Sequence, residues 1–311
     1  FKQKTAYEIY QCDWSSDVCS SDLPTKARAP PHFPLWSPIL LPYASTIFLS
    51  AFLLFLVQPL IAKQILPWFG GSAAVWTTCL LFFQSVLLAG YAYADASVRW
   101  LKPRQQMIVH IVLLLVSAAT LPIVADASWK PTGNEDPIPR ILMLLTVTLG
   151  LPYLMLSSTT PLLQAWYWRR YRAEVPYRLF ALSNFASLLA LLGYPVLVEP
   201  WFGGVEAARG WSVLYVLFAI ACGATGFISV RGHENEVQAK QEPAAPVPVL
   251  TLLTWLALAG MGSALLLAIT NHVTQNVASV PFLWVVPLAL YLITFIICFD
   301  HPRWYKRWLF L

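Results

Sequence analysis

Eight apolar stretches, each long enough to cross a lipid bilayer, constrain this chain more than any other feature. A transmembrane helix needs about 20 predominantly apolar residues. The stretches lie at residues 44–66, 74–94, 105–124, 140–163, 178–198, 210–229, 250–270 and 281–299. In lipid the backbone must satisfy its own hydrogen bonds, so such stretches form helices. We therefore predict an all-α protein, a polytopic transmembrane bundle of about eight helices within residues 44–300.

The composition also argues against a water-soluble fold. Hydrophobic residues make up 58% of the chain and charged residues 11%, whereas about a quarter of the residues in soluble domains are charged. The 14 tryptophans and 24 prolines are typical of membrane helices, which carry aromatic rings at the headgroup level and tolerate Pro in their interiors. We expect the lipid bilayer to be the main partner of this chain.

The first 23 residues resemble a technical artefact. Residues 2–9 (KQKTAYEI) and 12–23 (CDWSSDVCSSDL) match the translation of adapter DNA used in short-read sequencing. Such scars have to be removed before a fold is inferred. We therefore exclude residues 1–23 as non-biological and interpret residues 24–43 as a cytoplasmic N-terminal segment.

Lys and Arg are distributed unequally among the predicted loops. If the first helix leaves the cytoplasm, most of these residues lie in inside segments, and those outside are Lys130, Arg140 and Arg209. Cytoplasmic loops carry the excess of Lys and Arg, so we predict that both ends are cytoplasmic, with residues 231–248 as a flexible cytoplasmic linker. The basic aromatic clusters at 166–172 and 301–308 are typical of anchors at the lipid headgroups.

The pentapeptide PWFGG occurs twice, at residues 67–71 and 200–204. Each copy follows a predicted helix that contains a Pro, and an even number of helices separates the copies. A duplicated four-helix unit, with the two copies related by an axis along the membrane normal, is one interpretation. A chance match of five residues is the other.

Polar side chains within apolar helices are candidates for a solute pathway, because lipid makes them costly. In the first predicted helix, Gln58 precedes a Pro, and Lys63 follows just over a turn later, where it can also snorkel to the outer surface. Gln84 in the second helix and Asn184 in the fifth can hydrogen-bond across helices. Glu199 lies at the outer end of the fifth helix and is interpreted either as a solute contact or as a helix cap.

The richest polar patch lies between the seventh and eighth predicted helices. It contains Asn271, His272, Thr274, Gln275 and Asn276. Uncharged donors and acceptors with one titratable imidazole suit a polar solute or a proton relay. A plain extracellular loop explains the patch equally well.

The sequence offers no pattern typical of an enzyme site. Both WFGG copies lie between hydrophobic helices, which is the wrong context for a nucleotide-binding loop. Cys79, Cys222 and Cys298 are scattered through apolar runs without the spacing of metal ligands or of a disulfide framework. We predict no catalytic residue, metal or cofactor, and no nucleic-acid partner.

Three long blocks resemble the membrane half of the bacterial fused major facilitator/spermidine synthase proteins. They read QPLIAKQILPWFGGSAAVWTTCLLFFQSVLLAGYAYA, LSNFASLLALLGYPVLVEP and TNHVTQNVASVPFLWVVPLALYLITFIICF. The resemblance spans nearly all of residues 44–300. It implies a bacterial inner membrane location and a following cytoplasmic domain, begun by residues 301–311. That domain would be similar to aminopropyltransferases, which bind decarboxylated S-adenosylmethionine and a polyamine. No synthase residue can be assigned within this chain.

Two functional hypotheses follow from the resemblance. In the first, the chain is a transporter-like module that handles or localises polyamine-related chemistry and contacts a small polar or cationic solute. In the second, it is a passive membrane anchor for the synthase-like domain. An intramembrane enzyme would need an acid–base pair, and the predicted spans lack one.

Overall fold

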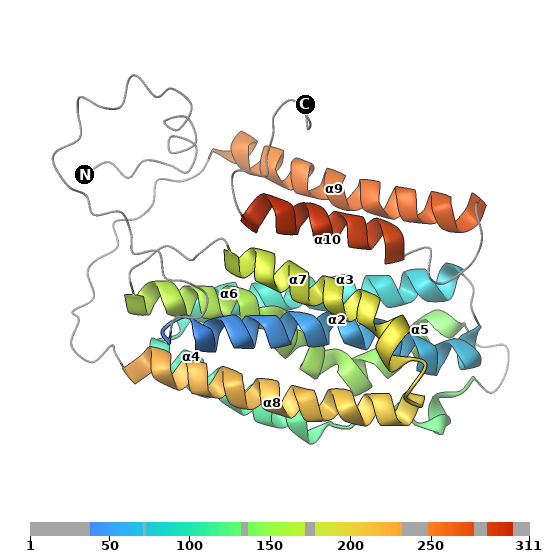
Figure 1. The fold of residues 1–311 in the computed structure, drawn as a ribbon, viewed down its shortest axis with the longest axis horizontal. Coiled ribbons are helices and arrows are strands. Elements are labelled where there is room, and N and C mark those ends of the chain that lie inside the picture. The colour runs from blue at the N-terminus through green and yellow to red at the C-terminus, as the bar shows by residue number, and fades with distance from the viewer. Residues whose placement is uncertain are drawn as a thin grey trace. The chain divides into compact units, whose positions relative to one another are not determined.

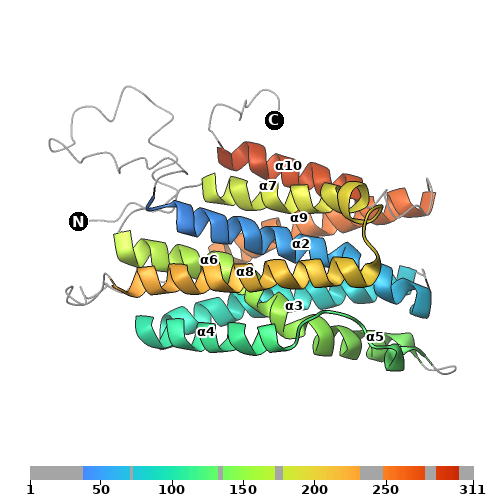
Figure 2. The same cartoon turned by 60° about the horizontal axis from the view of Figure 1, so that its bottom comes forward.

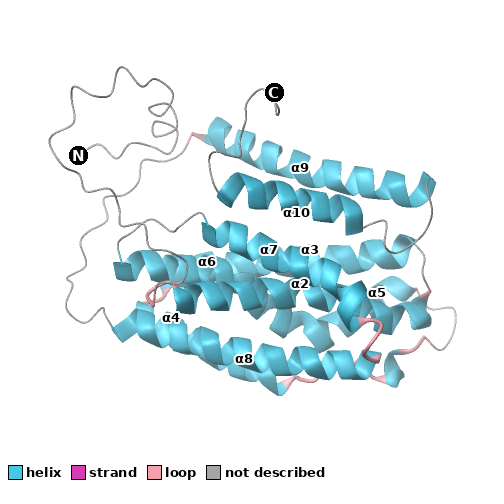
Figure 3. Cartoon of the chain, viewed as in Figure 1, coloured by secondary structure: helices cyan, strands magenta, loops and turns pink. Residues whose placement is uncertain are grey.

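The structure, a computed structural model, describes residues 38–70, 73–131, 136–171, 178–231, 248–276 and 285–300. These residues are helical and contain no strand (Figure 3). The α-helices are α2 (Leu41–Phe69), α3 (Ala73–Trp100), α4 (Pro103–Ala119), α5 (Pro137–Leu145), α6 (Leu151–Tyr171), α7 (Arg178–Gly193), α8 (Gly204–Arg231), α9 (Val249–Asn276) and α10 (Val285–Asp300). The segments predicted at residues 1–23 and 301–311, residues 24–37 of the N-terminal segment predicted at 24–43, and nearly all of the predicted linker lie outside the described residues.

Short segments of other helix types complete these elements. A 3-10 helix, η1 (Ala127–Trp129), lies in the loop after α4. A π-helical turn, η2 (Thr146–Gly150), joins α5 to α6, and a second, η3 (Tyr194–Val198), extends α7. With α5, η2 and α6 counted as one continuous helix, the described residues form eight helices, which confirms the all-α bundle predicted from the sequence.

The helices have the length and apolar character of a multi-pass membrane protein. By these criteria six segments can span a membrane: Leu41–Phe69, Thr77–Trp100, Pro137–Tyr171, Arg178–Val198, Gly204–Val230 and Val249–Thr270. The remaining two, α4 and α10, are apolar but shorter, with 17 and 16 residues. The helix predicted at residues 105–124 is therefore too long at its end. It stops at Ala119 because Pro122 lacks the N–H that a continuing helix needs.

α2 lies at the centre of the bundle. It packs against α6, α7 and α8, and Figures 1 and 2 both show it between α7 and α8. Leu53, Val57, Ile61 and Ile65 are fully buried on it. A helix surrounded by other helices must be apolar on all its faces, which explains why α2 shows almost no polar face in the sequence.

α9 lies at the edge of the bundle. It packs against α10, which in turn packs against α7, so α10 lies between α9 and the central helices (Figure 1). The apolar window of α9 is not buried by other described parts of the chain. A helix that is apolar all round and exposed on most of its surface is typical of a segment surrounded by lipid.

Proline and threonine account for the two π-helical turns. Pro195 lies within η3 and Pro152 follows η2, and a proline removes one backbone hydrogen bond and pushes away the carbonyl four residues earlier. Within η2, the hydroxyls of Thr146 and Thr148 donate to the carbonyls of Leu142 and Leu144, each at 2.7 Å. Side-chain hydroxyls of this kind satisfy carbonyls that an interrupted helix leaves free.

The first PWFGG copy begins in the last turn of α2, and the second follows η3, which extends α7; α2 and α7 run in the same direction (Figures 1 and 2). Gly70, in the first copy, caps α2 with a φ of 82°, a left-handed conformation that favours glycine. A Cβ built on Gly204, in the second copy, would lie 3.9 Å from Cγ of Gln64 on α2. Gly204 thus lies beside the last turns of α2, and the origin of the two copies by duplication stays a prediction.

Candidate functional site

The structure pairs two of the predicted site residues. Lys63 Nζ, near the end of α2, lies 3.3 Å from Oε1 of Glu199, directly after η3. Their side chains remain 40% and 46% exposed. Lys63 therefore does more than snorkel, because it links the end of α2 to the end of the α7–η3 helix.

Polar contacts on neighbouring residues involve two loops, the one after α4 and the one before α8. Gln64 Oε1 accepts a hydrogen bond from the backbone N–H of Ala125 at 3.1 Å, while its Nε2 is buried without a partner. Glu206 accepts a hydrogen bond from the N–H of Gly203 at 3.1 Å, at the start of α8. Carboxylates at a helix start stabilise it through the free N–H groups there.

The other predicted residues within helices have separate surroundings. Gln58 Nε2 donates to the hydroxyl of Tyr153 at 3.2 Å and so bridges α2 and α6. Asn184 Nδ2 donates to the carbonyl of Phe180, on its own helix, at 2.8 Å. This bond lies within one helix, and a bond of Asn184 across helices stays a prediction. Gln84 is exposed on α3, away from the other candidates.

The predicted polar patch belongs to a helix. Asn271, Gln275 and Asn276 lie in the last turns of α9, which ends at Asn276, so they do not lie in the loop between the seventh and eighth helices. His272 is exposed there. The 28 residues of α9 span about 42 Å at about 1.5 Å per residue. They exceed a hydrocarbon core of about 30 Å, which explains a polar helix end. Residues 277–284 lie outside the described residues.

A buried polar cluster, which the sequence analysis missed, lies between α3, α4 and α6. We call it the α3–α4–α6 cluster, and its members are Tyr93, Ser97, Gln106, His110, Trp166 and Arg169. Gln106 is fully buried at its centre. Its Oε1 accepts hydrogen bonds from Trp166 Nε1 at 3.0 Å and from an Arg169 Nη at 2.7 Å, and its Nε2 donates to Ser97 Oγ at 3.1 Å.

His110 lies one turn further along α4 and is also fully buried. Its Nδ1 is 3.3 Å from the hydroxyl of Tyr93, and the two rings are stacked at 6.0 Å between centroids. The edge contact with Trp166 has a centroid distance of 5.9 Å. The Nε2 of His110 is buried without a hydrogen-bond partner.

One signal in the sequence indicates this cluster. Gln106 and His110 are polar residues four apart within an apolar stretch, a spacing that places both on one face of a helix. In the sequence, Trp166 and Arg169 cannot be told apart from the aromatic and basic residues that anchor a helix at the lipid headgroups. They were interpreted above as such anchors. The structure instead turns both side chains towards Gln106.

Hydroxyl groups form further contacts between helices. Tyr43 and Ser229, and Thr46 and Thr225, join α2 to α8 at 2.7 and 3.2 Å. The hydroxyl of Tyr215 on α8 lies 2.6 Å from that of Ser117 on α4. Such bonds contribute only about 0.6 kcal/mol each on average, so they tune the packing of α8 without defining a site.

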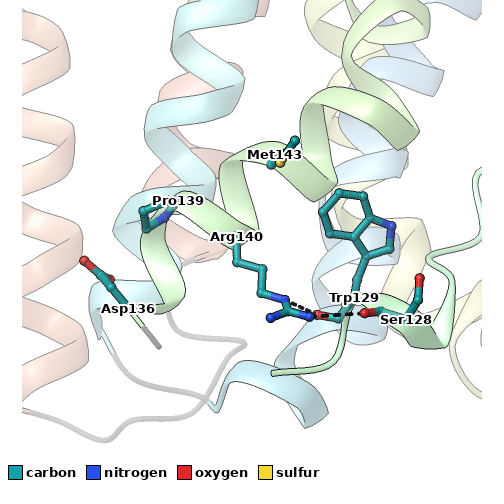
Figure 4. Close-up of a pocket in the computed structure, with 6 residues that line it drawn as sticks. All are labelled: Ser128, Trp129, Asp136, Pro139, Arg140 and Met143. Carbon is teal, nitrogen blue, oxygen red and sulfur yellow. Dashed lines mark hydrogen bonds between the residues drawn. The ribbon is translucent and has the colours of Figure 1, made fainter. Parts of the chain in front are cut away.

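A shallow surface hollow of about 480 Å³ lies beside α5 (Figure 4). It is lined by Ser128, Trp129, Asp136, Pro139, Arg140 and Met143. The guanidinium of Arg140 donates to the carbonyls of Trp129, Ser128 and Lys130 at 3.0 to 3.2 Å. These bonds tie α5 to the loop after α4, so Arg140 has a structural role in this hollow.

The same loop contains a carboxylate, Asp126, that caps η1. Asp126 Oδ1 accepts a hydrogen bond from the N–H of Ser128 at 2.8 Å, which caps η1. Hydrogen bonds from Ser128 to the charged carboxylate lower the pKa of Asp126. This cap stabilises the loop and does not create a binding group.

Comparison with protein-family models, with curated proteins and with solved structures finds no match to the chain. Within the described ranges, no three His, Cys, Asp or Glu side chains come together in an arrangement that would hold a metal ion. The α3–α4–α6 cluster and the Lys63–Glu199 pair are therefore the candidate sites. Any function proposed for them has to be argued from the geometry of these residues.

Proposed function

We propose that this chain is a transporter-like membrane module, in the bacterial inner membrane, that moves or positions a small polar or cationic solute. The α3–α4–α6 cluster carries this proposal. Buried polar and charged groups are costly in lipid-facing proteins and usually mark pathways or relays. A passive anchor needs none of them, because apolar helices alone hold a domain at a membrane.

The class of solute comes from the sequence resemblance. Polyamine-related chemistry fits a module that accompanies a synthase-like domain. Within the described helices, however, carboxylates lie only in or near end turns, at Asp95, Glu199, Glu206 and Asp300. A polycation crossing the bundle would therefore rely on aromatic faces, which attract cations by about 0.5–2 kcal/mol each. Tyr93 and Trp166 supply such faces in the cluster.

The passive anchor remains the second candidate, and one observation favours it. The interior around α2 is filled by side chains that are not exposed at all, such as Leu53, Val57 and Ile61. A packed interior suits an anchor, and a transporter would have to open it. The proposal assigns no catalytic role to the described residues in either case.

Flux into proteoliposomes separates the two candidates. The purified full chain is reconstituted, and uptake of labelled spermidine and putrescine is compared with that of empty vesicles. We expect uptake above that of empty vesicles. In Gln106→Leu, uptake should fall by about tenfold or more, because weakening an interaction by about 1.4 kcal/mol changes an equilibrium tenfold. The matched control is Gln84→Leu, on the exposed face of α3, which should retain uptake.

The anchor gains support if folded, reconstituted protein moves neither polyamine above empty vesicles. Size-exclusion chromatography of both variants in detergent shows whether they remain folded. Equal loss of uptake in Gln84→Leu and Gln106→Leu would remove the role of the cluster while leaving transport itself intact.

A further inference from the structure

His110 carries a buried nitrogen that nothing in the structure satisfies. Its side chain is 0% exposed, and Nε2 has no hydrogen-bond partner. Leaving a buried polar group unpaired is unfavourable, and a purely apolar ring at this position would avoid it. The other ring nitrogen, Nδ1, lies 3.3 Å from the Tyr93 hydroxyl. When Nδ1 carries the hydrogen and donates it to Tyr93, Nε2 retains a free lone pair.

Among the residues that the structure describes, the groups around this lone pair are neutral or positive. α4 packs against α3, α6 and α8. Facing the cluster from these helices are Tyr93 on α3, Arg169 on α6, which donates to Gln106, and Cys222 on α8, which interacts with Tyr93. The carboxylate of Asp95 on α3 is exposed and bonded to Arg99, and Glu206 lies at the start of α8, by Gly203.

An imidazolium at this place would thus have no counter-charge within the described helices. Gln106 lies one turn from His110, which is about 5.4 Å along the helix, and it already holds the Arg169 guanidinium. A second positive charge so close to the first, in a medium of low dielectric constant, disfavours the packed arrangement. The packed arrangement therefore requires a neutral His110.

The space around the cluster limits what can bind there. Gly226 of α8 faces Trp166, and a Cβ built on it would lie 3.0 Å from Cζ3 of Trp166 and 3.4 Å from Cγ of Met107. The first distance is tighter than ordinary van der Waals contact and the second is at its limit, so α8 leaves little room beside Trp166 in the packed arrangement. A proton is the ligand that needs no such volume.

We infer that His110 Nε2 is a proton-binding site, and that protonation loosens the contact of α4 with α3 and α6 so that the imidazolium reaches water. The proton leaves hydronium, or another acid in the water, and bonds to the free lone pair of Nε2. The inference rests on the proposed function in one respect, since the proton would then be the coupling ion of the transporter-like module.

The test measures how thermal stability depends on pH, and it needs no solute. Purified full chain in detergent is unfolded by heat between pH 7.5 and pH 5. An exposed imidazole takes up a proton near pH 6.5, whereas the folded protein holds His110 neutral, so unfolded or opened states bind more protons and stability falls with acid. We expect the melting temperature to fall by roughly 3 °C per pH unit below pH 6.5.

Two glutamine variants identify the group responsible. His110→Gln should lose this slope, whereas His272→Gln, at an exposed position of α9, should retain it. A buried imidazole that stays neutral in the folded protein produces this slope through linkage, and the glutamine variant removes the group that titrates. An unchanged slope in that variant therefore overturns the inference.

A measurement on the unmodified chain covers the case in which His110→Gln does not fold. An imidazolium quenches an adjacent indole, and His110 lies against Trp166. Tryptophan fluorescence should fall between pH 7.5 and pH 5, and Trp166→Phe should lose that change. A flat titration, or one that Trp166→Phe leaves intact, contradicts the inference.

The outcomes of this test and of the flux assay are independent. A pH slope that depends on His110, without any polyamine uptake, supports the proton site and refutes transport of these solutes. Uptake without the slope supports the transport proposal and refutes the proton site.

Discussion

Gln106 satisfies most of its hydrogen-bonding capacity inside the bundle. Its carbonyl oxygen accepts from Trp166 and Arg169, and its amide donates to Ser97. All three bonds join α4 to neighbouring helices. Removing such a side chain lowers stability mainly because the buried donors and acceptors that it paired with lose their hydrogen bonds.

Replacing Gln106 with Leu should therefore destabilise the protein. The variant leaves the indole N–H of Trp166 and one donor of Arg169 without an acceptor, and an unsatisfied buried group costs about 1–3 kcal/mol. Thermal or denaturant unfolding in detergent measures the change. Gln84→Leu makes the same chemical change on an exposed face of α3 and should shift stability by less than about 0.5 kcal/mol. Equal effects would contradict the role of Gln106.

The Lys63–Glu199 pair should contribute weakly to stability. Both side chains are partly exposed, and exposed pairs typically contribute about 0.2–1 kcal/mol. A double-mutant cycle with Lys63→Ala and Glu199→Ala measures their coupling, which should decrease with added salt.

The exposed pair Asp95–Arg99, within one helix, is the reference for this cycle, with about 0.3–0.5 kcal/mol expected. A coupling above about 2 kcal/mol between Lys63 and Glu199, insensitive to salt, would contradict a weak surface pair and indicate that membrane or protein shields it from water.

At the scale of elements, glycine decides how closely α3 and α6 approach. A Cβ built on Gly90 of α3 would overlap Oγ of Ser157 and lie 3.1 Å from the backbone nitrogen of Ser158 on α6. Backbone atoms of a packed helix cannot move away cheaply. Small residues at helix interfaces in membranes allow such close approach.

Gly90→Ala should destabilise the bundle by about 1–3 kcal/mol through overpacking. The matched control is Gly223→Ala on α8, where an added Cβ meets nothing within 4 Å. That variant should be neutral or stabilising by up to about 1 kcal/mol, because alanine favours helix more than glycine does. Melting temperatures of the two variants in one detergent measure the difference, and a stabilised Gly90→Ala would contradict the close packing of α3 and α6.

At the scale of the whole molecule, the described chain begins and ends on one side of the bundle. α2 starts and α10 finishes at the same end (Figure 2), as an even number of antiparallel crossings requires. Arg99, Lys102 and Arg169 lie towards this end, and Lys130 and Arg140 lie in or next to the loop at the opposite end. The orientation in the membrane remains a prediction from this asymmetry of charge.

Reporter fusions test that orientation. A reporter fused after Trp168, or within residues 231–248, should show cytoplasmic activity, and one fused after Gly203 should show periplasmic activity. The physical reason is the excess of Lys and Arg in the loops near the first two sites. Periplasmic activity after Trp168 would refute the predicted orientation, and activity on opposite sides for the first two sites would refute the number of crossings.

The positions of the helices followed from the sequence because their cause is local. Lipid requires each crossing segment to satisfy its own backbone, so an apolar run of sufficient length predicts a helix without knowledge of its neighbours. The stretch predicted at 178–198 coincides with the helical segment Arg178–Val198. The prediction was less accurate where an apolar stretch is not helical or a polar stretch is. The first case is the end of α4 before Pro122, and the second is the polar end of α9.

The partners of the polar side chains were decided by tertiary structure alone. Lys63 and Glu199 were each predicted as candidates, but 136 positions separate them in the sequence, and only the packing of α2 against α7 brings them together. Gln106 and Trp166 are 60 residues apart, and no spacing within one helix indicates which neighbour a polar face meets. In an apolar bundle, many helix arrangements bury similar area. The pairing of polar groups therefore depends on the arrangement that close packing selects.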